Sequence, residues 1–161
     1  MLPAVFRYIT GRCFPTIDAT LHDWKRCRIL DETFPAATPV AGESIEGILW
    51  LRVSAPELER LDNFEGGDYR RVTVKVSDRL GQVYPAQIYA WAGAETLVDE
   101  PWDVERFKQT DLKEFMRKHL PGLSEHFSEN EHTIHKSAKF PELSYQALPT
   151  TALMSFIKRN K

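Results

Sequence analysis

The chain has 161 residues, of which 42% are hydrophobic and 27% are charged, and its formal net charge is −2. This length predicts one main domain, and the composition is typical of a soluble globular protein. The small negative charge, without a long Lys/Arg block, argues against nucleic acid as the main partner. No apolar run reaches the roughly 18–20 residues of a membrane span, and no secretory signal is seen. Two cysteines make no disulfide framework, which predicts a reducing, cytoplasmic location.

The N-terminal part of the sequence predicts a helix and then a strand. Apolar residues recur at helical spacing over residues 3–12, and Gly11 is expected to end that helix. Residues 16–20 are expected to be connecting chain. Loose alternation of polar and apolar residues over residues 21–30 then predicts a strand.

Two further extended segments are expected before residue 54. Residues 33–39 contain two prolines, which favours an edge strand or a pocket-lining loop over a central strand. Residues 41–44 are expected to turn the chain. Residues 45–53 form the most apolar strand candidate in the sequence.

A second helix and a β-hairpin follow. Ser54 with Glu57 three residues later is a capping box, which marks the start of a helix. Gly66 and its neighbouring glycine end that helix, because glycine reaches positive φ without strain. Alternating residues over 71–77 and 82–91, joined by a turn, predict the two arms of a hairpin.

The C-terminal part of the sequence is expected to lie outside the main domain. Asp103 is predicted to cap a helix that ends before residue 121. A short last helix is expected over residues 151–158. We therefore assign residues 1–122 to the domain and residues 123–161 to a C-terminal extension that is partly helical or flexible. Many strands with few helices predict an α+β fold with a mostly antiparallel sheet, curled into a small barrel.

Glu65 is the strongest candidate for a functional side chain. It stands where a helix ends, two glycines bend the backbone and a strand begins. A carboxylate at such a junction can be fixed by its surroundings and still be open to a ligand. From these residues alone, a solvated turn residue is the simpler interpretation, because a motif without structural context is weak support.

Other candidate chemistry is less well supported. His126, His132 and His135 could share a metal ion with nearby glutamates, but a solvated tail explains them better, so no metal site is predicted. Cys13 and Cys27 lack a CxxC arrangement, which argues against a nucleophilic thiol.

The order of several short segments resembles the gamma-glutamylcyclotransferase-like family, in its avirulence-induced-gene branch known from plants. The most specific piece is Leu61–Gly66 together with Tyr69–Arg71, which reads LDxFEGxxYxR. The other matching pieces are residues 19–24, 34–36, 44–47, 86–91 and 101–103. This resemblance implies a small mixed β-barrel with flanking helices.

The resemblance also implies a reaction and a site. Glu65 would be the acid/base residue that helps a γ-glutamyl group cyclise to 5-oxoproline with release of an amine, without metal or cofactor. The substrate would be a small γ-glutamyl molecule. Tyr69, Tyr89 and Pro35 are placed to line its pocket, and packing in the core is an equally good interpretation of these three residues.

One family feature is missing from the sequence. The family opens with a strand that ends in Tyr-Gly-Ser/Thr-Leu, whose backbone amides hold the substrate carboxylate, and this chain has no such motif. Residues 5–12 align better with the family's first helix, so the chain is expected to start just after that loop. A non-catalytic member that binds a small ligand or a protein is therefore the alternative function. An exposed sheet edge left by the missing strand would allow a homodimer.

Overall fold

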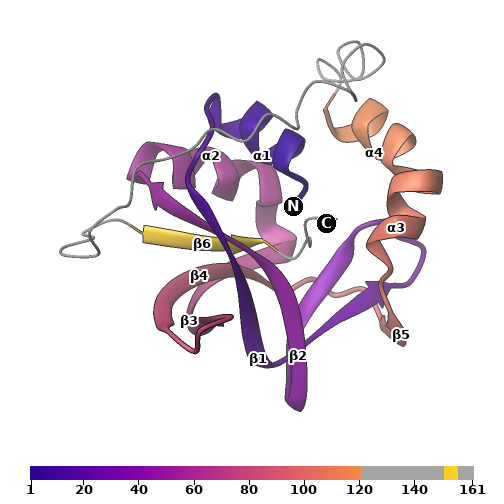
Figure 1. Cartoon of the computed structure of the whole chain (residues 1–161). Helices are drawn as coiled ribbons and strands as arrows, with labels where there is room; N and C mark the ends of the chain where they lie inside the picture. The colour runs from indigo at the N-terminus through magenta and orange to yellow at the C-terminus, as the bar shows by residue number, and fades with distance from the viewer. Residues whose placement is uncertain (121–150, 156–161) are drawn as a thin grey trace. The chain divides into compact units, whose positions relative to one another are not determined.

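The computed structural model describes residues 1–120 and 151–155. Among these, residues 1–102 and 151–155 form one compact unit, and residues 103–120 belong to a second. Figure 1 shows the helices and strands with their labels.

The first unit is built on a closed β-barrel of five strands. In the ring, β2 pairs with β6, then β4, β3 and β1, and β1 returns to pair with β2. All neighbours are antiparallel except β4 and β6, which are parallel. The strands are β1 (Thr16–Ile29), β2 (Pro35–Val53), β3 (Tyr69–Asp78), β4 (Val83–Trp91) and β6 (Thr151–Ser155), with β5 (Leu97–Pro101) added to the edge of β1. The predicted α+β fold with a mixed, mostly antiparallel barrel is confirmed.

The barrel wall is buried on both of its faces where the last part of β2 runs. Side chains alternate across a strand, so Leu49 and Leu51 point to the barrel interior while Ile48 and Trp50 point outward. The outward residues form a second core with the helices. This two-sided burial explains why residues 48–51 read as an unbroken apolar run.

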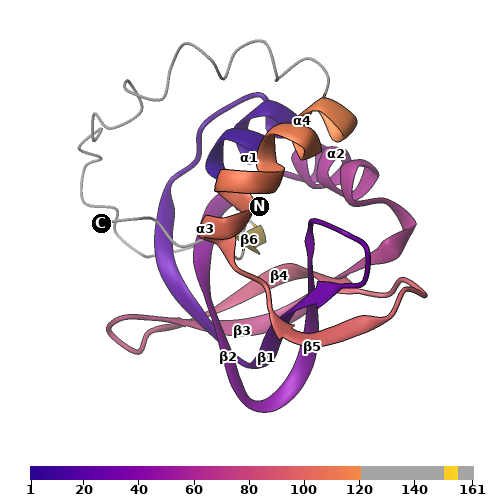
Figure 2. The same cartoon turned by 90° about the vertical axis from the view of Figure 1, so that its right-hand side faces the viewer.

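Helices α1 (Pro3–Thr10) and α2 (Ala55–Glu65) cover this second core and run close together (Figures 1 and 2). Phe6 of α1 stacks on Trp50 of β2, with ring centroids 4.2 Å apart. Gly11 ends α1 with a φ of 82°, a left-handed conformation that glycine adopts without strain. Both helices confirm the predictions from spacing and capping.

Strands β1 and β2 are longer than predicted, and two of the predicted connecting segments are wrong. Residues 16–20 are part of β1, and residues 41–44 lie inside β2. Thr16 pairs with Trp50 and Thr20 with Glu46, so the partner that makes residues 16–20 a strand lies far along the sequence. Local composition gave no sign of that pairing.

The expected turn at residues 41–44 is instead an irregularity within the β1–β2 pair. The register shifts between His22 and Trp24, and both Asp23 and Gly42 have positive φ. The Asp23 carboxylate accepts a hydrogen bond from the Gly42 amide at 2.9 Å, which holds the two irregular positions together. Gly42, which contributed to the prediction of a turn, therefore lies in a β-bulge instead.

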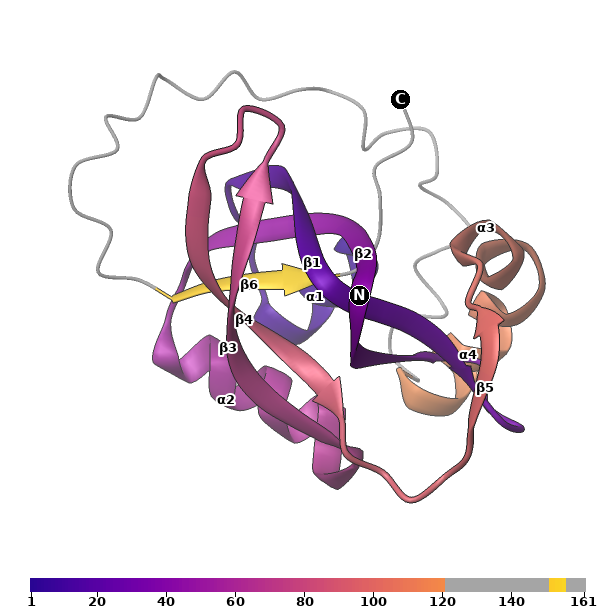
Figure 3. The same cartoon turned by 90° about the horizontal axis from the view of Figure 1, so that it is seen from below.

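The helix predicted over residues 151–158 is also wrong, because residues 151–155 form β6 between β2 and β4. Ala152 and Met154 belong to the interior core and Leu153 to the second core, which is strand alternation. Figure 3 shows β6 within the barrel. The predicted boundary at residue 122 therefore separates residues 151–155 from the domain that they complete. The rest of the predicted extension, with His126, His132 and His135, lies outside the described residues.

The second unit contains a helical segment that starts at its predicted cap. The Asp103 carboxylate accepts hydrogen bonds from the amides of Glu105 at 2.8 Å and Arg106 at 3.2 Å. The segment runs through α3 (Val104–Arg106), a π-helical stretch (Phe107–Asp111) and α4 (Leu112–His119). No helix in the described part of the chain has the length and apolar content to cross a membrane.

The position of β6 leads to a stability prediction. Leu153 is 2% exposed, whereas Leu80, in the turn of the β3–β4 hairpin, is 93% exposed. Leu153→Ala should lower the free energy of unfolding by about 3 kcal/mol, because it leaves a cavity in the second core. Leu80→Ala, the same chemical change at the surface, should cost less than about 0.5 kcal/mol. Urea unfolding of the two variants measures the difference, and equal midpoints would contradict the placement of β6.

Candidate functional site

Glu65 is the last residue of α2, and Gly66, with a φ of 68°, follows it. The residue keeps part of its surface exposed, yet protein atoms surround its carboxyl group closely. Burial raises the pKa of Glu65 to about 7, opposed by the Met1 amine and assisted by the charge of Asp62. The C-terminal end of a helix acts in the same direction, since it disfavours negative charge. Glu65 is therefore poised to gain or lose a proton near neutral pH.

Tyr69 and Pro35, two of the predicted pocket residues, are in direct contact. The Tyr69 hydroxyl donates to the Pro35 carbonyl oxygen at 2.7 Å. The Tyr69 ring meets Trp91 edge to face, with centroids 5.2 Å apart. Burial raises the pKa of the Tyr69 hydroxyl and the charge of Glu65 raises it further, so this hydroxyl stays neutral. A contact of Tyr69 or Pro35 with substrate remains a prediction.

Tyr89, the third predicted pocket residue, joins a different group. Its hydroxyl donates to an oxygen of Asp62 at 2.7 Å. Arg71 binds both oxygens of Asp62, at 2.8 and 3.0 Å, and also donates to the side-chain oxygen of Gln87. Burial raises the pKa of Tyr89, with further contributions from Asp62 and Glu65. Tyr89 packs in the second core, and a contact with substrate remains a prediction for it too.

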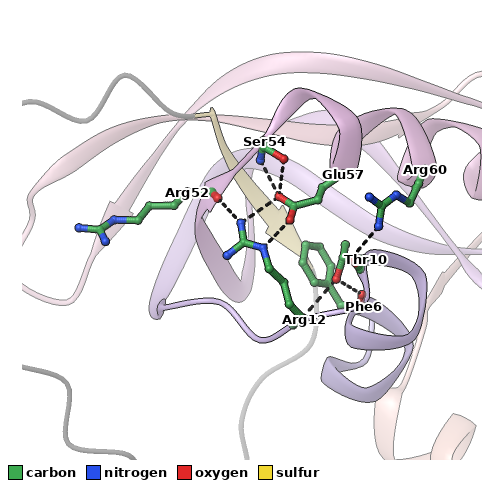
Figure 4. Close-up of polar contacts among 7 residues, drawn as sticks. All are labelled: Phe6, Thr10, Arg12, Arg52, Ser54, Glu57 and Arg60. Carbon is green, nitrogen blue, oxygen red and sulfur yellow. Dashed lines mark hydrogen bonds and ion pairs between the residues drawn. The ribbon is translucent and has the colours of Figure 1, made fainter.

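The start of α2 is fixed by the predicted capping box (Figure 4). The buried Glu57 carboxylate accepts hydrogen bonds from the Ser54 amide at 2.7 Å and the Ser54 hydroxyl at 2.8 Å. Arg12 binds both oxygens of Glu57 and also donates to the Arg52 carbonyl oxygen at 3.0 Å. The hydrogen bond from Arg12, with those from Ser54, holds the pKa of Glu57 at about 2 against the opposing effect of burial.

A second contact ties α2 to α1. Arg60, near the middle of α2, donates to the Thr10 carbonyl oxygen at 2.9 Å, and the Thr10 hydroxyl donates to the Phe6 carbonyl oxygen at 2.7 Å (Figure 4). Helix α2 is thus bound to Arg12 near its start, to the end of α1 near its middle, and to β3 near its end through the contact of Asp62 with Arg71.

Sequence reasoning did not single out Asp62 and Trp91 for a role at the site. Asp62 stands in the LDxFEGxxYxR piece together with Arg71, so their spacing was visible but their contact was not. The indole N–H of Trp91 is buried and has no hydrogen-bond partner within residues 1–120 and 151–155, which makes it a candidate donor to a ligand. A Cβ added at Gly93 would lie 2.4 Å from the Trp91 ring, so this ring requires glycine there.

Within the described residues, no three His, Cys, Asp or Glu side chains are grouped as a metal site requires. Cys27 is buried and burial raises the pKa of its thiol, which disfavours the reactive thiolate. The group of Glu65, Asp62, Arg71, Tyr69 and Tyr89 is therefore the best-supported candidate site in this part of the chain.

Comparison with known sequences finds a matching family and several similar proteins. Residues 1–109 match the family described as gamma-glutamyl cyclotransferase, AIG2-like. AIG2-like protein D of Arabidopsis thaliana is 30% identical over 124 residues, which cover 73% of this chain and 79% of that protein. AIG2-like protein A of the same plant is 28% identical over 116 residues, or 71% of this chain and 70% of that protein.

Solved structures share the fold. The solution structure of one Arabidopsis thaliana protein aligns with a TM-score of 0.56 and 24% identity, over 80% of this chain and 87% of that chain. A second Arabidopsis thaliana solution structure aligns with a TM-score of 0.55 and 24% identity, over 89% of this chain and 88% of that chain.

The Glu57 contacts predict an acid-dependent loss of stability. A depressed pKa means that Glu57 contributes stability above its unfolded pKa of about 4.3 and loses that contribution as the pH falls toward about 2. Glu57→Gln should lower the free energy of unfolding by about 1–2 kcal/mol at pH 7, and the difference from wild type should shrink below pH 4. Chemical unfolding at a series of pH values measures it. A difference that does not change with pH would contradict the ionised contact.

The raised pKa of Glu65 predicts the opposite pH dependence of the free energy of unfolding. Its raised pKa means that the folded state is penalised as the pH rises from about 4.3 through about 7, where the carboxyl group ionises in its buried place. Glu65→Gln should match wild type near pH 4 and become more stable than wild type by about 3 kcal/mol at pH 8. Thermal and urea unfolding measure the two curves. Glu59→Gln, at an exposed position of α2, should give no such divergence, and a Glu65 variant that behaves like it would refute the burial effect.

Proposed function

Because the chain belongs to the gamma-glutamyl cyclotransferase, AIG2-like family, we propose that it cyclises γ-glutamyl amides to 5-oxoproline with release of an amine. Glu65 is the general acid/base of this reaction. The observation that carries the proposal is a carboxyl group at the end of α2 whose burial raises its pKa to about 7. A group that titrates near the working pH can both accept and return a proton, which is the requirement for such catalysis.

The chemistry needs few other groups. The α-amine of the γ-glutamyl unit attacks the carbonyl carbon of its own side-chain amide, so a new C–N bond closes the five-membered ring. The old C–N bond to the amine portion then breaks. Because the attack is intramolecular, the substrate itself brings the reacting atoms together.

Proton transfer is the part that the protein supplies. An α-amine has a pKa near 8, so it must lose a proton before it can attack, and the leaving nitrogen must gain one. The α-ammonium first loses one proton to water. As the neutral amine attacks, ionised Glu65 accepts its second proton and donates it to the leaving nitrogen, and the released amine then takes up a proton from water. The carboxylate ends the cycle ionised again, and no proton is gained or lost overall.

The surroundings of Glu65 support this role. Tyr69 and Tyr89 stay neutral, and their rings supply low-dielectric walls near the carboxyl group. Tyr69, Tyr89 and the backbone at Pro35 are the proposed substrate contacts, and the buried indole N–H of Trp91 is a further candidate donor to a ligand. The proposal needs no metal or cofactor.

We also propose that the protein works in a reducing compartment such as the cytoplasm. Cys13 is exposed, Cys27 is buried, and both are unpaired. An exposed unpaired thiol is typical of reducing conditions.

The decisive experiment compares Glu65→Gln with Glu59→Gln, an exposed glutamate of the same helix. Formation of 5-oxoproline from a panel of γ-glutamyl amines and γ-glutamyl amino acids is measured by chromatography. Glu65→Gln should lower the rate by at least about 100-fold, because it removes the proton-transfer group, whereas Glu59→Gln should leave it unchanged. The wild-type rate should rise with pH through about 7 as Glu65 ionises.

Two outcomes would overturn the proposal. Equal rates for Glu65→Gln and wild type would remove Glu65 from the mechanism. Binding of γ-glutamyl compounds by the wild type without turnover, measured by calorimetry, would favour the alternative of a non-catalytic small-ligand-binding member of the family.

A further inference from the structure

Arg71 is the cation that could compromise the proposed role of Glu65. It lies two residues after Tyr69 in β3, so the two side chains share one face of that strand. It pairs across the sheet with Tyr89, whose hydroxyl pKa responds both to Glu65 and to Arg71. A guanidinium within roughly 4–6 Å of a carboxyl group lowers the pKa of that group by about 1–3 units. If the Arg71 guanidinium turned toward Glu65 and came within that distance, it would lower the pKa of Glu65 and favour its ionised form at neutral pH.

In the structure, the Arg71 side chain is bound to Asp62 and Gln87. Its guanidinium binds Asp62 with two parallel hydrogen bonds, from Nε at 2.8 Å and Nη2 at 3.0 Å, and Nη1 donates to Gln87. Such a paired arrangement fixes the direction of the planar group as well as neutralising its charge. The Tyr89 hydroxyl donates to the same carboxylate at 2.7 Å and holds Asp62 in place.

Asp62 stands three residues before Glu65 on α2, so the two carboxyl groups lie on the same side of the helix. From this geometry, and resting on the proposed function, we propose that Asp62 is a positioning residue. It binds the Arg71 guanidinium and so prevents this cation from pairing with the Glu65 carboxylate.

Several charged or titratable groups face Glu65 from the elements around it. The Met1 amine comes from the segment before α1, Asp62 from α2 itself, Tyr69 from β3 and Tyr89 from β4. Arg26 acts on the Met1 amine. Among these groups, Asp62 is the one bound to Arg71 on strand β3, so replacing Asp62 removes one charge and also releases the Arg71 guanidinium.

A double-mutant cycle tests the proposal on the whole chain. In Asp62→Asn a negative charge is lost and Arg71 is released, so the titration midpoint of the Glu65 carboxyl should fall by about one pH unit or more. In Arg71→Gln the charge of Asp62 is left uncompensated, so the midpoint should rise. In the double variant neither charge remains, and the midpoint should return close to the wild-type value. Asp62→Glu, which keeps the carboxylate, should preserve the midpoint better than Asp62→Asn.

The readout is the carbon NMR titration of the Glu65 side chain, assigned by its loss in Glu65→Gln. It needs no turnover, so its result is independent of whether the chain is a cyclotransferase. If the chain is active, the acid side of the pH–rate profile should move to lower pH in Asp62→Asn with the same sign. Unchanged Glu65 midpoints in both single variants would overturn the proposal, as would a double variant that shifts like Asp62→Asn. If Asp62→Asn does not fold, the upward shift in Arg71→Gln decides the question.

Discussion

Charged side chains hold helix α2 at both ends, and this attachment fixes the environment of Glu65. At the start of the helix Glu57 binds Arg12, in the middle Arg60 binds the Thr10 carbonyl group, and near the end Asp62 binds Arg71. Leu58 and Leu61 pack into the core below. A carboxyl group on a loosely held helix end could turn toward water and titrate normally. Because α2 is fixed, the last residue of the helix stays where it is poorly solvated.

Two glutamates of this helix show how position decides chemistry. Glu57 and Glu65 have the same side chain, yet their pKa values are about 2 and about 7. Glu57 is buried with a guanidinium, an amide and a hydroxyl group, so its charge is compensated. Burial dominates at Glu65, so its charge is penalised. The first arrangement stabilises the fold at neutral pH, whereas the second costs stability there and leaves a carboxyl group that exchanges its proton readily.

Local signals in the sequence predicted the parts of the molecule that depend on neighbours along the chain. The capping box of Ser54 and Glu57, the glycine after Glu65 and the hairpin of β3 and β4 all follow from residues a few positions apart. The contact of Asp62 with Arg71 was not predicted, because it depends on how α2 lies against β3. Glu65 was a weak candidate from its own residues, and the family resemblance made it a strong one. The burial that raises the pKa of Glu65 results from tertiary packing, so it could not be predicted from the neighbouring residues in the sequence.

The strand β6 shows most clearly where local reasoning stops. Residues 152–154 are apolar and suit a short helix as well as a strand, and the pairing of β6 with β2 and β4 decides for the strand. The family match ends at residue 109, but the barrel does not. Leu153 of β6 packs in the same core as Leu61 and Tyr89, so this strand helps to form the core against which α2 packs. The strand β6 pairs with segments far away in the sequence, and the entropy cost of bringing such distant segments together is expected to make closure of the barrel slow. The core against which α2 packs is therefore complete only once residues 151–155 have joined the sheet.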